Sequence, residues 1–110
     1  MKNSRSRFRK FGNTKTTVDG IIFDSKAESK HWFELKIRER AGEISNLQRQ
    51  VTYRLEVNGE LICKYIADYV YMENGQEVTA DCKGFITPEF RIKAKLFKAI
   101  YGRDILIMKS

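Results

Sequence analysis

The sequence has few of the residues that mark secreted, membrane-spanning or zinc-stabilised proteins. It contains two cysteines, Cys63 and Cys82, one histidine and no Cys-x-x-Cys motif. A disulfide framework and a structural zinc site are therefore not expected. No apolar run approaches the roughly 20 residues of a membrane-spanning helix, and the basic N-terminus lacks the apolar stretch of a secretory signal. These absences favour a reduced, cytoplasmic protein that has no membrane partner.

Acidic residues are absent from residues 1–18, which hold six lysines and arginines. Residues 19–82 hold eight basic and twelve acidic residues, whereas residues 83–110 hold seven basic and two acidic residues. The whole chain has 110 residues and a net charge of +7, enough length for one small domain. An acidic middle between basic flanks suits a protein that holds a cation and approaches a polyanion. The alternative is a basic surface that only keeps a small protein in solution.

Residues 1–17 are basic and polar and show no clear period, so we expect a flexible arm. A single domain would then occupy residues 18–110. The cations of the arm suit a DNA backbone, although an ordinary disordered terminus would have the same composition. The arm residues expected to bind DNA are Arg5, Arg7, Arg9 and Lys10.

An Asn-Gly pair at 74–75 predicts a β-hairpin, because both central residues of a type I′ turn need positive φ. The pairing that this turn imposes places Asp68 opposite Asp81, and Lys83, two residues further on, shares their face. Opposed carboxylates repel each other, and a divalent cation such as Mg²⁺ would offset that repulsion. A bulge, a solvated face or a simple salt bridge between Lys83 and an acid would account for the same residues without a metal.

A second Asn-Gly pair, at 58–59, predicts another hairpin and hence a three-stranded antiparallel meander. In its simplest register Arg49 opposes Asp68, so that Arg49 reaches the carboxylates. Gln50 would then face away from them unless a bulge intervenes.

The remaining segments predict two helices and a final buried strand. Ser25 is a good N-cap for a helix over residues 26–41, and Glu28 completes a capping box. Glu28 also shares a face with Trp32, so a capping role and a site role compete for one side chain. Thr87 and Pro88 begin a second helix that ends near residue 101, and residues 104–108 follow as the strand. The second helix offers either a solvated face or a phosphate-binding surface, formed by Arg91, Lys93, Lys95 and Lys98.

The order of these elements, with Asp68 preceding Asp81-Cys82-Lys83, resembles the PD-(D/E)XK nuclease superfamily. Ala67 stands where a proline often precedes the first acid, and Asp81 stands where glutamate is more frequent. A closer resemblance is to a family of small phage-encoded, endonuclease-like proteins of unknown function. The segments that resemble it are VDGIIFDSKAESKHW, AGEISNLQRQV, YIADYVY and DCKGFITPEFRIKAKLF.

The resemblance implies an α+β fold with an αβββαβ core, in which helices flank a mixed sheet. It also implies Mg²⁺- or Mn²⁺-dependent hydrolysis of DNA. The residues implied in catalysis are Glu28, Asp68, Asp81 and Lys83. The metal ligands implied are three carboxylates and one main-chain carbonyl, from Glu28, Asp68, Asp81 and Cys82. Two polar residues are expected as accessory groups, Arg49 and Gln50.

The setting implied is DNA replication, recombination or packaging by a phage, in the cytoplasm of its bacterial host. A non-catalytic DNA-binding module and an interaction subunit of a phage DNA-processing complex are the alternatives. The sequence leaves open a homodimer, contacts with phage replication or packaging proteins, and the choice among junction, nick, flap and duplex substrates.

Overall fold

The computed structural model describes residues 16–18 and 20–110. Its elements, in chain order, are β1 (Thr16–Val18), β2 (Ile21–Phe23), α1 (Lys26–Arg40), β3 (Ser45–Val57), β4 (Glu60–Glu73), β5 (Gln76–Lys83), α2 (Pro88–Tyr101) and β6 (Leu106–Lys109). After the β1–β2 hairpin, this is the expected order of helix, three strands, helix and strand. The expected arm falls outside the described residues, except that β1 includes residues 16 and 17.

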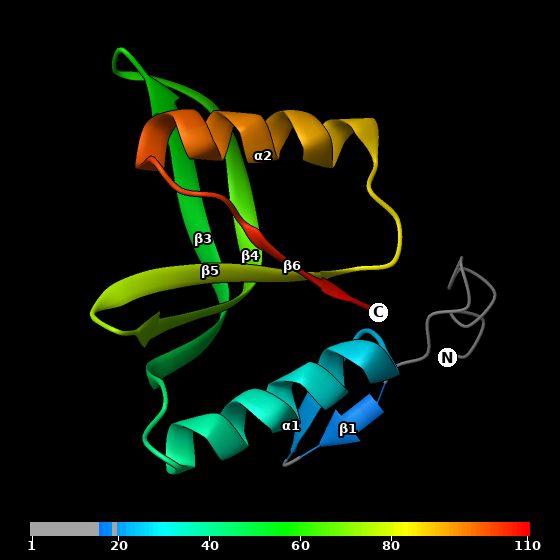
Figure 1. Cartoon of the computed structure of the whole chain (residues 1–110). Helices are drawn as coiled ribbons and strands as arrows, with labels where there is room; N and C mark the ends of the chain where they lie inside the picture. The colour runs from blue at the N-terminus through cyan, green and yellow to red at the C-terminus, as the bar shows by residue number, and fades with distance from the viewer. Residues whose placement is uncertain (1–15, 19) are drawn as a thin grey trace, which may run out of the picture.

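The main sheet has four strands in the order β3-β4-β5-β6. β3, β4 and β5 form the antiparallel meander, and β6 adds to β5 in parallel. Figure 1 shows the two helices on either side of this mixed sheet, with α2 across the β3–β4 hairpin and α1 at the other end of the molecule. The expected α+β fold is confirmed. No helix of the described chain is both long and apolar enough to cross a membrane.

The second hairpin has the register that its turn predicts. Asn74 and Gly75 have φ values of 53° and 76°, as a type I′ turn requires. Pairing then runs from Glu73 opposite Gln76 to Tyr69 opposite Ala80.

The first hairpin departs from its predicted register. The strands pair as expected at the turn, but the register shifts by one residue between Glu56 and Leu55. Arg49 therefore lies opposite Tyr69, and the prediction that it lies opposite Asp68 is wrong. A second irregularity in the pairing lies near the start of β3, between Ser45 and Gln48.

α1 begins where the sequence predicts. The Ser25 hydroxyl caps it by accepting a hydrogen bond from the Glu28 main-chain N–H, at 3.1 Å. Its buried face sets Trp32 and Leu35 against Tyr69, Tyr71 and other buried residues of the sheet. This packing fixes α1, and with it Glu28, over β4 and β5.

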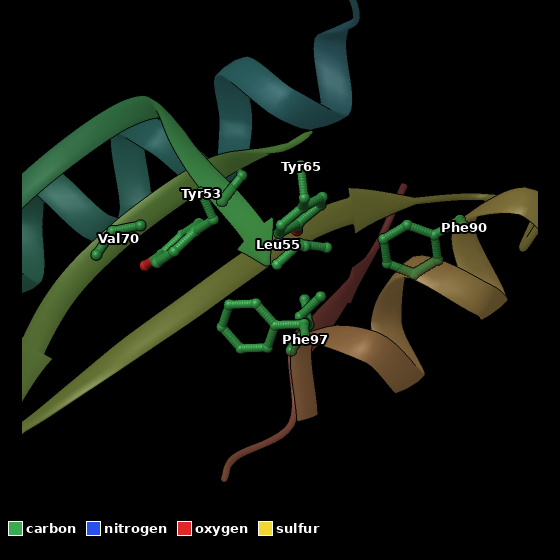
Figure 2. Packing of buried hydrophobic residues seen from close by; sticks show 8 residues of the cluster. Tyr53, Leu55, Tyr65, Val70, Phe90 and Phe97 are labelled. Atoms are coloured by element: carbon green, nitrogen blue, oxygen red, sulfur yellow. The ribbon is translucent and has the colours of Figure 1, made fainter. Parts of the chain in front are cut away.

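α2 covers a second cluster of buried side chains at the other end of the sheet. Phe90 and Phe97 of α2 pack against Tyr53, Leu55 and Tyr65 of β3 and β4 (Figure 2). The tyrosines of β4 are thus divided between the two helices, with Tyr65 in the cluster beneath α2 and Tyr69 and Tyr71 in the cluster beneath α1.

Candidate active site

The site lies where the pairing between β4 and β5 ends. The last backbone pair is Tyr69 with Ala80, one residue short of Asp68 and Asp81. Beyond it, the Asp68 main-chain N–H donates to Asp81 Oδ1 at 3.1 Å, and the Cys82 main-chain N–H donates to Asp68 Oδ2 at 2.9 Å. The carboxylates satisfy N–H groups that the ladder would otherwise have paired. The two acids therefore lie side by side, as the hairpin predicts.

Gln50 reaches Asp68 from β3 because the backbone there leaves the ordinary strand conformation. Its φ is 53°, in the left-handed region, and it is missing from the pairs between β3 and β4. Its side-chain amide donates to Asp68 Oδ1 at 3.4 Å. The prediction that Gln50 faces away is wrong, since a shift in register turns it toward the acid. A glutamine with positive φ costs of order 1–3 kcal/mol, and such strain is concentrated at functional sites.

Glu28 acts both as a helix-capping residue and as a neighbour of the acid pair. Its Oε1 accepts from the Asp24 main-chain N–H at 3.4 Å, one residue earlier than the Ser25 N–H of a standard capping box. Burial, followed by the negative charge of Asp68, raises the pKa of Glu28 to about 7. The structure thus brings the Glu28 carboxylate, which α1 carries, close enough to Asp68 for their charges to interact.

Arg49 contacts Glu28 and not Asp68. Its Nη2 lies 3.9 Å from Glu28 Oε1, and its guanidinium carbon lies 4.4 Å from the centre of the Phe23 ring and 5.8 Å from that of Trp32. These rings and the carboxylate hold the guanidinium in place. Arg49 is therefore positioned to support Glu28, an accessory position different from the one its predicted register gave it.

Lys83 stands beside Asp81 at the end of β5. Its Nζ lies 3.4 Å from Asp81 Oδ2 and 4.6 Å from the centre of the Phe90 ring. Asp81 is only 2% exposed. Burial, followed by interaction with Asp68, raises the pKa of Asp81 to about 7 even though Lys83 opposes the shift. A single ammonium group does not neutralise this acid cluster.

The donor chemistry of the cluster fits a hard divalent cation. Three carboxylates, from Glu28, Asp68 and Asp81, supply the oxygen ligands that Mg²⁺ and Mn²⁺ prefer. A cation would also offset the burial and the mutual repulsion that raise the pKa values of Glu28 and Asp81. Within the described chain, however, no group of three or more histidine, cysteine or acidic residues has the arrangement of a metal site as it stands. The Cys82 thiol is not suited as a ligand, since burial and the nearby acids raise its pKa to about 11. This leaves only its main-chain carbonyl as the ligand implied by the resemblance.

A cleft of about 360 Å³ opens beside the acid pair. Asp68, Asp81 and Lys83 line it together with Lys93 of α2. It is also lined by residues that sequence reasoning missed, Lys64, Tyr65, Ile66, Thr87, Glu89 and Phe90. Alternation along β4 places residues 64 and 66 on the face of residue 68, a signal that could have identified two of them.

Only one of the expected basic residues of α2 reaches this cleft. Lys93 lines it, and its Nζ lies 3.7 Å from Glu89. Arg91, Lys95 and Lys98 follow i, i+4, i+7 spacing and so share a different stripe of the helix; Lys98 pairs there with Asp104 at 3.4 Å. The expected DNA-binding residues of the arm lie outside the described residues. They are Arg5, Arg7, Arg9 and Lys10.

Comparison with known sequences places the chain in one family. A search of the curated proteins finds no match. A family model described as "Protein of unknown function (DUF1064)" matches residues 8–109, which include all the described elements. The chain therefore belongs to the DUF1064 family, whose function is not known.

Proposed function

We propose that the protein is a metal-dependent DNA endonuclease of the PD-(D/E)XK type. The observation that carries this proposal is the meeting of Asp68, Asp81 and Lys83 at the open end of the β4–β5 ladder, beside a cleft. Glu28 adds a third carboxylate from α1, as the resemblance implies. The order of the elements also agrees with that superfamily.

Mg²⁺ or Mn²⁺ would be held by Glu28, Asp68, Asp81 and the Cys82 carbonyl. Such an ion, when bound, polarises a phosphate oxygen and lowers the pKa of a water molecule. The buried carboxylates supply the negative charge that draws a cation into the site.

Lys83 and Gln50 have separate roles in this proposal. Lys83 would stabilise the charge that develops on the phosphate during cleavage. Its position between Asp81 and the Phe90 ring keeps the ammonium group at the cleft. The Gln50 side-chain amide would hold the Asp68 carboxylate in a fixed orientation through the hydrogen bond that it donates.

The lysines of the cleft would contact the DNA backbone without reading the sequence of the bases. No part of the described chain forms a separate specificity domain, so we expect selectivity for DNA structure. A phage-encoded role in replication, recombination or packaging, with partner proteins in the host cytoplasm, rests on the resemblance. Reproducible cutting at one short sequence would overturn the expectation of structural selectivity.

The second candidate is a DNA-binding or interaction module that does not cut DNA. It is favoured by the hydrogen bonds that the acids already make. Asp68 accepts from Cys82 and Gln50, while Asp81 accepts from Asp68 and pairs with Lys83. This arrangement satisfies the acid pair without a metal ion.

The test is cleavage of supercoiled plasmid and of a four-way junction in Mg²⁺ or Mn²⁺. Asp81→Asn removes the charge of a buried site acid, and Asp104→Asn removes that of an exposed acid paired with Lys98. We expect metal-dependent cutting by the wild type and Asp104→Asn, and none by Asp81→Asn. If none of the three cuts DNA and all bind it, the non-catalytic candidate is correct.

A further inference from the structure

An exposed aromatic residue, Phe85, lies in the segment that joins two residues of the cleft wall. Phe85 is 73% exposed, more than any other large hydrophobic residue in the described part of the chain. It lies midway between Lys83 and Thr87, both of which line the cleft. Two residues of extended chain span at most about 7 Å, so the Phe85 backbone cannot be far from either. Such exposure beside a polar cleft suggests a ligand with a flat apolar surface.

The cleft wall itself combines cations with apolar and aromatic groups. Lys64 and Lys93 line it beside Ile66, Tyr65 and Phe90. A site that contacts only the phosphates of a duplex needs polar donors alone. Tyr65 and Phe90 are buried, so the ring accessible to a base in this part of the chain is that of Phe85. An accessible aromatic residue near cations is typical of sites for unpaired nucleotides, whose bases stack on rings while lysines neutralise the phosphates.

The size and charge of the cleft agree with this chemistry. Its volume of about 360 Å³ is at the lower end of the range for small-ligand sites, a size that suits one nucleotide. Lys83 and Lys93 each have an acidic partner. Lys64 takes part in none of the ion pairs within the described chain, so its charge is available to a phosphate.

We propose that the cleft binds one unpaired nucleotide of a DNA strand, with the base stacked on Phe85 and the phosphate near Lys64 and Lys83. This inference deepens the proposed nuclease function and rests on it for the identity of the site. It selects branched, flapped or single-stranded DNA over continuous duplex as the substrate.

Binding in EDTA tests the proposal without requiring cleavage. Fluorescence anisotropy would compare a labelled thymine oligonucleotide, an all-abasic strand of the same length, and a duplex. The variant is Phe85→Ala, and the matched control is Phe33→Ala, which removes a 54% exposed ring from α1. We expect Phe85→Ala to weaken binding of the thymine strand about tenfold and to leave the abasic strand and the duplex unchanged. Phe33→Ala should change none of the three.

Two further variants separate base stacking from phosphate contact. Lys64→Ala should weaken binding of the thymine strand and of the abasic strand by the same factor, since both strands have the same phosphates. Lys95→Ala, which removes a lysine of α2 that does not line the cleft, should weaken binding of each strand less. Phe85→Trp should keep tight binding and show fluorescence quenching by the thymine strand but not by the abasic strand.

The outcomes distinguish this inference from the nuclease proposal. If Phe85→Ala binds the thymine strand as tightly as the wild type, the stacking role is wrong, even if the protein cuts DNA. Equal losses for the thymine and abasic strands would also overturn it. The predicted losses in a protein that never cuts DNA would refute the nuclease proposal alone, and the cleft would remain a binding site for unpaired nucleotides.

Discussion

Replacing Asp81 by asparagine should stabilise the metal-free protein while abolishing its proposed activity. Asp81 is 2% exposed, and burial with the neighbouring Asp68 raises its pKa from 3.8 to about 7. Above about pH 7 the Asp81 carboxylate is ionised while buried in the folded protein. The same charge costs less in the unfolded chain, where water surrounds it. An asparagine oxygen can still accept the hydrogen bond that Asp81 Oδ1 accepts from the Asp68 N–H.

The magnitude follows from the pKa. One pH unit corresponds to about 1.4 kcal/mol, so ionised Asp81 costs the fold at most about 4 kcal/mol at pH 8. This upper limit already includes the attraction between Asp81 and Lys83, whose side chain is 32% exposed and remains accessible to water. We expect a net gain of about 1–3 kcal/mol in the free energy of unfolding. Below about pH 4 the acid is protonated in both states, and the gain should vanish. The stability of the wild type should accordingly fall as the pH rises from about 4 to 7.

Urea denaturation in EDTA at pH 8 and at pH 4 measures this difference. Asp104→Asn, at an exposed ion pair, should change the free energy of unfolding by less than about 1 kcal/mol at either pH. An Asp81→Asn protein that is less stable than the wild type at pH 8 would refute the reasoning, because it would mean that Lys83 and the hydrogen bonds more than neutralise the buried charge.

Three further predictions concern the metal, the strained residue and the core. Mg²⁺ at a hundred times its dissociation constant should stabilise the wild type by about 2.7 kcal/mol and Asp68→Asn hardly at all; equal stabilisation in a thermal melt would exclude Asp68 as a ligand. Gln50→Gly should be more stable in urea than Gln50→Ala by about 1 kcal/mol, because the left-handed φ of 53° is strained only with a side chain; equal stabilities would show that the strain is negligible. Phe97→Ala, at a fully buried ring, should lose about 3–5 kcal/mol in urea, and a loss below 1 kcal/mol would contradict the packing described beneath α2.

The second hairpin and its acid pair could be predicted because their register depends on local chemistry. The Asn74-Gly75 turn fixes the pairing of β4 with β5, and the distance from that turn places Asp68 beside Asp81. The helix starts at Ser25 and Thr87 are equally local, since each hydroxyl accepts from an N–H three residues ahead. These signals were sufficient for the fold and for the centre of the site.

The first hairpin could not be predicted because its register depends on packing. Without the shift near Leu55, Tyr53 would oppose Lys64. The shift places it opposite Tyr65 instead, and both rings then pack beneath α2. β4 carries apolar residues on both faces, so its pattern could not decide between the registers. The same shift brought Gln50 to the site, which is why its contact with Asp68 was missed.

The measurement that tests the central claim most directly is cleavage of an end-labelled flap oligonucleotide while Mg²⁺ is titrated. A nuclease centred on Asp68 and Asp81 predicts cutting that rises with Mg²⁺, stops in EDTA and is absent in Asp81→Asn. A folded wild-type protein that binds the flap but leaves it intact at every concentration of Mg²⁺ and of Mn²⁺ would contradict the claim.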